Sequence, residues 1–200
     1  MPYPDLLKEK GGTGFPSLFW MDADGNVLAR QGERSVEGFT KTLKNLKAHA
    51  DLKAKAAKGD RAATVDLLVS EIELGKLDFD AASKQAKGLG ELTNEQKARI
   101  DGLLLGLEVS KLASARTPDA RAAASKQMLG MMKEGRIPTG NAARLFYSMV
   151  LTAAEAEKDA KAFEQAMEGI KQLVGDDARA KPMLDSMQKR LDKLKGDGDK

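Results

Sequence analysis

The feature that most constrains the fold is residues 14–28, where two apolar runs flank a turn sequence. Residues 17–21, Ser-Leu-Phe-Trp-Met, are too continuously apolar to leave one face in solvent. The following Asp-Ala-Asp-Gly-Asn favours a tight turn, because Asp and Asn side chains bond the local backbone and glycine accepts positive φ. Residues 27–30 supply a return strand, so the segment predicts an antiparallel β-hairpin.

The same turn could also be read as a calcium loop, because Glu33 stands twelfth from Asp22. Such a loop needs glycine at its sixth position, which here is Val27, and it needs flanking helices where this sequence predicts strands. The hairpin turn is therefore the favoured interpretation.

The composition of the chain changes near residue 48. Before it, a helix predicted from Ser35 carries Phe39, Leu43 and Leu46 at helical spacing. After it, the strong helix formers Ala, Leu, Lys, Glu, Met and Gln dominate. Capping residues divide this part into helices that begin next to Asp60, Asp78, Thr93, Thr117, Asn141, Asp159 and Asp176.

These patterns predict a predominantly α-helical chain with a small α+β piece at its N-terminus. The α+β piece, a β-hairpin plus one helix, occupies residues 1–47. Residues 48–195 are expected to form a helical bundle or an irregular α-solenoid, because the helix pairs starting near 60, 93 and 139 are unequally spaced. Residues 196–200 are expected to be a disordered tail.

Charge and hydropathy argue against nucleic acid and membrane as partners. The formal net charge is +3, and residues 1–58 hold all of the surplus, ten Lys or Arg against seven Asp or Glu. This balance gives no global electrostatic case for nucleic acid. No apolar run approaches the roughly 20 residues of a membrane span, so none is expected.

A modest basic face is predicted on the helix that follows the hairpin. Asp51 is the only acidic residue between positions 41 and 58. On a helical wheel, five lysines lie on one side of this helix: Lys41, Lys44, Lys47, Lys55 and Lys58. No aromatic residues interleave with them for base stacking, so a solvated helix face is favoured over a phosphate-binding strip.

Three methionines, Met128, Met131 and Met132, cluster in one predicted helix. Methionine clusters suit adaptable binding grooves, but packing in a helical core is the commoner use and is favoured here.

The chain has no cysteine, and its only histidine is His49. Disulfides, thiolate zinc sites and thiol redox chemistry are therefore excluded. A lone histidine cannot form a His-rich metal cluster, so His49 is expected at the surface or at a helix end. No Gly-rich phosphate loop, Gly-X-Ser-X-Gly or His-Glu-X-X-His is present. We assign no catalytic residue, metal site or cofactor, and the sequence leaves open whether the chain is an enzyme.

Residues 6–47 resemble the C-terminal half of a thioredoxin-like domain, as found in thioredoxins and protein disulfide isomerases. The resemblance rests on the order Gly-X-Pro, apolar strand, Asp-Gly turn and return strand, and on Gly-Phe-Pro-Ser-Leu, which matches the Gly-Phe-Pro-Thr type of that family. It implies a cis bond before Pro16 and a neighbouring backbone edge that pairs with an extended substrate. Phe15 and Pro16 are thus the implied substrate-binding residues.

The family's redox pair, Cys-X-X-Cys, lies well before this proline, and only fifteen residues precede Pro16 here. The resemblance therefore implies a relative without the family's reaction. It also leads us to expect a parent protein that is an exported bacterial member of the family, whose N-terminal half is absent from this chain. The localisation stays open, because the N-terminal residues do not read as a signal peptide.

Residues 160–166, Ala-Lys-Ala-Phe-Glu-Gln-Ala, resemble the second helix of a tetratricopeptide-type repeat. The 34-residue period and signature of that repeat are absent, so the helical region is interpreted as tetratricopeptide-like rather than as a member of the family.

The preferred functional hypothesis is a non-catalytic thioredoxin-like module for protein interaction or scaffolding, with a protein or peptide partner. A homodimer through the exposed sheet edge is a second expectation. The alternative is the C-terminal portion of a thiol-disulfide oxidoreductase whose active-site half is missing from this chain. A third class, a basic RNA- or DNA-binding adaptor, is weakly supported and would show a steep dependence of binding on salt.

Overall fold

The computed structural model describes residues 5–12 and 14–197, and the predicted hairpin is present. Strand β1 (Leu18–Met21) pairs antiparallel with β2 (Val27–Gln31), with a bulge between Trp20 and Met21. In the turn, the Asp22 carboxylate accepts the backbone N–H groups of Asp24 and Asn26 at 3.0 and 2.8 Å. Asn26 also donates its side-chain amide to Asp22, and these bonds hold the pKa of that carboxyl below its ordinary value. Hydrogen bonds to the Asp22 carboxylate therefore hold the turn.

The described residues are predominantly helical, as predicted. The helices are α1 (Leu6–Glu9), α2 (Val36–Ala56), α3 (Arg61–Glu73), α4 (Phe79–Lys87), α5 (Asn94–Ala113), α6 (Pro118–Lys133), α7 (Asn141–Ala156), α8 (Ala160–Val174), the 3₁₀ turn η1 (Ala178–Ala180) and α9 (Lys181–Asp197).

Most of the predicted helix starts are confirmed by their caps. The carboxylates of Asp60, Asp78 and Asp159 each accept the backbone N–H three residues on, at 3.0, 2.8 and 2.9 Å. Thr93 and Gln96 form the predicted reciprocal box, with bonds of 3.0 and 3.2 Å. These caps satisfy N–H groups that the first helical turn leaves without a partner.

The start predicted for the last helix is wrong. Asp177, not Asp176, accepts the backbone N–H of Arg179 at 3.0 Å and caps the turn η1, after which α9 begins at Lys181. Helix α9 continues to Asp197, so part of the tail predicted at 196–200 is helical, and residues 198–200 lie outside the described residues.

The chain divides into two compact units, residues 1–103 and 104–200. We call them unit 1 and unit 2. The boundary lies inside α5, whereas the composition change near residue 48 lies inside α2. The domain bounds inferred from composition, 1–47 and 48–195, stay a prediction.

In unit 1, α2 packs against α3 and β2. The rings of Trp20 and Phe39 lie 6.1 Å apart, so the hairpin packs against the first turns of α2. On the other side, the backbone N–H of Arg30 donates to the carbonyl of Leu74 at 3.1 Å and ties β2 to the end of α3. The apolar side of α3 supplies most of this core: Val65, Leu68, Val69 and Ile72 are buried.

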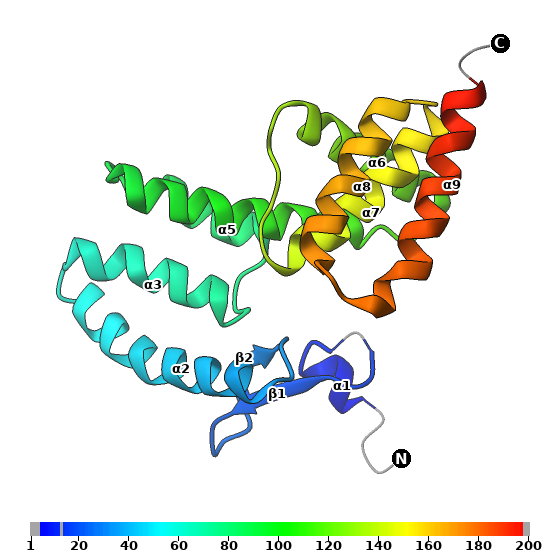
Figure 1. Ribbon diagram of the computed structural model, residues 1–200. Coiled ribbons are helices and arrows are strands. Elements are labelled where there is room, and N and C mark those ends of the chain that lie inside the picture. Colours follow the sequence, from blue (N-terminus) through cyan, green and yellow to red (C-terminus); the bar gives the residue numbers. More distant parts are fainter. Residues whose placement is uncertain (1–4, 13, 198–200) are drawn as a thin grey trace. The chain divides into compact units, whose positions relative to one another are not determined.

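In unit 2, each of the helices α6, α7, α8 and α9 packs against the next one in the chain (Figure 1). Phe146 and Phe163 are fully buried at the centre of this core. Met128, Met131 and Met132 are each at most 2% exposed and belong to the same core, so the core interpretation of the methionine cluster is confirmed. No helix in the described part of the chain has the length and apolar character that a membrane span requires.

Candidate functional site

Phe15 and Pro16 lie immediately before β1, on an exposed loop. The side chain of Phe15 is 80% exposed, and the Phe15–Pro16 peptide bond is cis. The Arg34 guanidinium donates to the carbonyl of Pro16 at 3.1 Å, and the Ser17 hydroxyl donates to the carbonyl of Gly14. These two bonds hold the loop in place just before strand β1. The substrate-binding role of Phe15 and Pro16 stays a prediction.

The outer edge of β1 has no strand partner among the described residues, because the sheet consists of β1 and β2 alone. In an antiparallel pair, residues alternate between bonding their partner and pointing their N–H and C=O groups away from it. The N–H of Arg30 points away from β1, because it donates to Leu74. Arg30 is opposite Phe19, so Phe19 directs its own N–H and C=O toward the open edge.

Apolar side chains flank this open edge. Leu18 is 38% exposed and Met21 is 43% exposed. Trp20 is held in place from the other strand, because its indole N–H donates to the side-chain oxygen of Gln31 at 2.8 Å, and Gln31 is buried. The edge therefore combines backbone groups that have no partner among the described residues with apolar side chains on a hairpin of fixed geometry.

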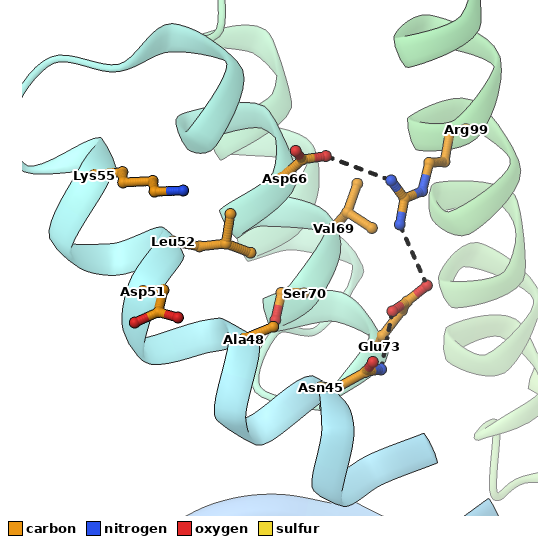
Figure 2. A pocket seen from close by; sticks show the side chains of 10 residues that line it. All are labelled: Asn45, Ala48, Asp51, Leu52, Lys55, Asp66, Val69, Ser70, Glu73 and Arg99. Atoms are coloured by element: carbon orange, nitrogen blue, oxygen red, sulfur yellow. Dashed lines mark hydrogen bonds and ion pairs between the residues drawn. The ribbon is translucent and has the colours of Figure 1, made fainter.

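A groove of about 420 Å³ lies in unit 1 between α2, α3 and the first half of α5, as Figure 2 shows. The residues lining it are Asn45, Ala48, Asp51, Leu52, Lys55, Asp66, Val69, Ser70, Glu73 and Arg99.

The charged side chains at the centre of the groove satisfy one another (Figure 2). The Arg99 guanidinium lies 3.4 Å from the Asp66 carboxylate and 3.8 Å from that of Glu73. The Asn45 amide donates to the other oxygen of Glu73 at 3.1 Å. These groups link three helices, and because the single guanidinium of Arg99 faces the two carboxylates of Asp66 and Glu73, the cluster keeps one net negative charge.

Next to this groove, His49 bridges α2 to α3 and to the segment after α3. Its Nδ1 lies 3.3 Å from the buried Ser70 hydroxyl, and its Nε2 lies 3.0 Å from the Lys76 ammonium. Of the two expected places, the helix end is wrong, because His49 lies within α2, and its side chain is partly buried. Burial, followed by the nearby positive charge of Lys76, lowers the pKa of His49 below its ordinary value.

A serine hydroxyl beside a histidine suggests a nucleophile and its base, but the hydrogen-bond directions exclude this role. The Lys76 ammonium can only donate, so Nε2 of His49 must hold the free lone pair. The neutral ring then carries its proton on Nδ1 and donates it to Ser70. With no lone pair at Nδ1, His49 cannot remove the serine proton, and the arrangement is a structural bridge.

Metal-binding clusters and the predicted basic face remain to be considered. The described residues contain no group of three or more His, Cys, Asp or Glu side chains placed to hold a metal ion. The five lysines of the predicted basic face are exposed, which agrees with a solvated surface.

The sequence did not reveal the contact of His49 with Ser70 and Lys76. These residues are 21 and 27 positions from His49, and no local pattern links them. The one available signal was a serine within the apolar run of α3, since a buried hydroxyl needs a polar partner.

Comparison with known proteins adds no relative. None of the family models, curated proteins or solved structures compared with this chain matches it.

Proposed function

We propose that the chain is a non-catalytic, thioredoxin-like protein-interaction module that holds an extended peptide along the open edge of β1. The observation that carries this proposal is the orientation of Phe19, whose backbone N–H and C=O face an edge without a strand partner among the described residues. Strand addition uses such an edge: backbone bonds give affinity, and pockets or patches for alternate side chains give specificity.

The flanking side chains favour a peptide with apolar residues. Leu18 and Met21 lie on the strand, and Phe15 stands at its entrance with most of its ring exposed. Leu18 and Met21 are three positions apart and lie on opposite faces of β1, so an added strand would meet an apolar side chain on each of its faces. The edge carries no charged residue, so a neutral, apolar strand would meet no unpaired charge there.

The helices of unit 2 support the scaffold part of the proposal. Each helix from α6 to α9 packs on the next, an arrangement that resembles helical-repeat scaffolds built by stacking neighbours. In this proposal, unit 1 binds the peptide and unit 2 provides the tetratricopeptide-like scaffold.

The experiment compares two substitutions at one position. Random heptapeptides displayed on phage are selected on the full chain, and the enriched peptides are titrated by fluorescence anisotropy. Phe19→Pro removes the outward N–H without removing a bond to β2, because Phe19 and Arg30 form the pair that is not hydrogen-bonded. Phe19→Ala keeps the N–H and removes only the ring.

We expect F19A to bind the selected peptides and F19P to lose most of the affinity, with both variants keeping native Trp20 fluorescence. Equal affinity of the two variants, or failure to select any peptide, would show that the edge is not a strand-binding site.

A further inference from the structure

Helix α2 keeps one apolar side exposed within unit 1. Its contacts with α3 lie on a different side, where Asn45 and His49 bond to side chains of α3. Val36, Phe39 and Leu43 follow one another at spacings of three and four residues, so they share one line along the helix. Their side chains are 79%, 38% and 41% exposed. We call these three residues the α2 stripe.

The α2 stripe is a preformed surface. The ring of Phe39 lies 6.1 Å from that of Trp20, which fixes the stripe against the hairpin while part of the ring stays exposed. The Ser35 hydroxyl accepts the backbone N–H of Gly38 at 3.0 Å and caps the first turn, which carries Val36. A partner on this surface would therefore bind without the cost of ordering the helix first.

The charged side chains beside the stripe change sign along α2. Glu37 stands next to Val36 in the first turn, whereas Lys44 and Lys47 stand further along the helix, near Leu43. All three charged side chains are exposed, and none has an ion-pair partner among the described residues. The surface is thus acidic at one end and basic at the other.

Such a surface is complementary to a reversed copy of itself. A two-fold axis between Phe39 and Leu43 lays α2 antiparallel to α2 of a second copy, and the same patch then serves on both molecules. Each α2 stripe covers the other, and Glu37 of each copy comes within reach of Lys44 and Lys47 of the second copy. A parallel arrangement would instead bring like charges together, which is unfavourable.

We propose that this side of α2 is a self-association surface through which two copies of the chain form an antiparallel dimer. Because the α2 stripe holds only three large apolar side chains, the dimer belongs to the small and reversible class of interfaces. The proposal goes beyond the peptide binding proposed above and does not depend on it.

Sedimentation equilibrium of the full chain, from about 5 to 500 µM, measures the Kd of the dimer. Leu43→Asp places a charge at the centre of the contact and should raise this Kd at least about ten-fold. Leu145→Asp in α7 is the matched control, because Leu145 is 42% exposed and lies in unit 2, and it should leave the Kd unchanged. Native Trp20 fluorescence reports that unit 1 is folded in both variants.

A charge exchange tests the antiparallel arrangement and does not depend on the folding of L43D. Glu37→Lys and Lys47→Glu should each weaken the dimer by about two- to five-fold, as expected for exposed ion pairs. The double variant E37K/K47E restores opposite charges across the two-fold axis, so its Kd should return toward that of the unsubstituted chain.

Three outcomes would overturn the proposal: a chain that stays monomeric over the whole range, an unchanged Kd in L43D, or no recovery in E37K/K47E. The F19P variant, which disables the edge of β1, should dimerise normally. Loss of the dimer in F19P would assign self-association to the sheet edge and would also contradict the proposal. Since peptide binding is measured separately with F19P and F19A, the two proposals can fail independently.

Discussion

At the residue scale, His49 shows how one side chain can join three segments without being catalytic. It lies between Ser70 and Lys76, and the Lys76 contact requires the neutral ring, because only an unprotonated Nε2 can accept from the ammonium. Burial and the Lys76 charge oppose the imidazolium, while Glu71 favours it and Lys53 opposes it more weakly. The net result is a pKa lower in the folded chain than in the unfolded chain.

This lowered pKa predicts a dependence of stability on pH. The unfolded chain takes up the proton more readily, so the stabilisation is complete above the unfolded pKa of about 6.5 and declines as pH falls below it. The free energy of unfolding of unit 1, followed by Trp20 fluorescence in urea, should therefore decrease between pH 7.5 and pH 5.

His49→Gln removes the titrating group and should give a flat profile over this range, because His49 is the only histidine. Lys76→Met should make the decline shallower, because one of the charges that oppose the imidazolium is gone. A decline that persists unchanged in H49Q would assign it to another group.

At the element scale, two helix glycines have opposite surroundings. A Cβ at Gly169 in α8 would collide with the ring of Tyr147 in α7, whereas a Cβ at Gly130 in α6 would meet nothing within 4 Å. Gly169 therefore permits the close approach of α7 and α8, and Gly130 does not serve such a purpose.

The two substitutions should change stability in opposite directions. G169A is expected to lower the free energy of unfolding by about 1–3 kcal/mol through overpacking. G130A should raise it by up to about 1 kcal/mol through helix propensity. Both are measured by urea unfolding with far-ultraviolet circular dichroism.

Tyr147→Ala provides the check on this explanation. In the Y147A background the ring is gone, so adding G169A should no longer be destabilising. If G169A costs the same in both backgrounds, its effect does not come from the contact with Tyr147.

At the scale of the whole molecule, each unit has its own core. Leu68 is buried in unit 1 and Phe163 in unit 2, and the only tryptophan, Trp20, lies in unit 1. Fluorescence therefore reports on one unit, while far-ultraviolet circular dichroism reports on the helices of both.

This division predicts that core substitutions act on one unit at a time. F163A should cost about 3–5 kcal/mol and shift the transition seen by circular dichroism, while the Trp20 transition stays near its original midpoint. L68A should cost about 2–5 kcal/mol and shift the Trp20 transition. A Trp20 midpoint lowered as much by F163A as by L68A would mean that the chain unfolds as one cooperative unit.

The sequence by itself determined the local structure of this protein. The hairpin turn follows from Asp22 and Gly25, and the helix starts follow from caps such as Asp60 and Thr93. These features were predictable because each depends on a side chain and a backbone group at most four residues apart. The one misplaced start, at Asp176, arose where two adjacent aspartates offered equivalent caps.

Only the tertiary structure decided which elements share a core. The capping box at Thr93 and the helical pattern that follows predicted a single helix, and nothing in that pattern shows that its halves join different units. The contacts of His49 and the orientation of Phe19 toward an open edge also depend on residues far away in the chain, such as Lys76 and Leu74. Local propensity fixes the backbone of each segment, but the partner of a buried face is chosen by packing among all segments at once.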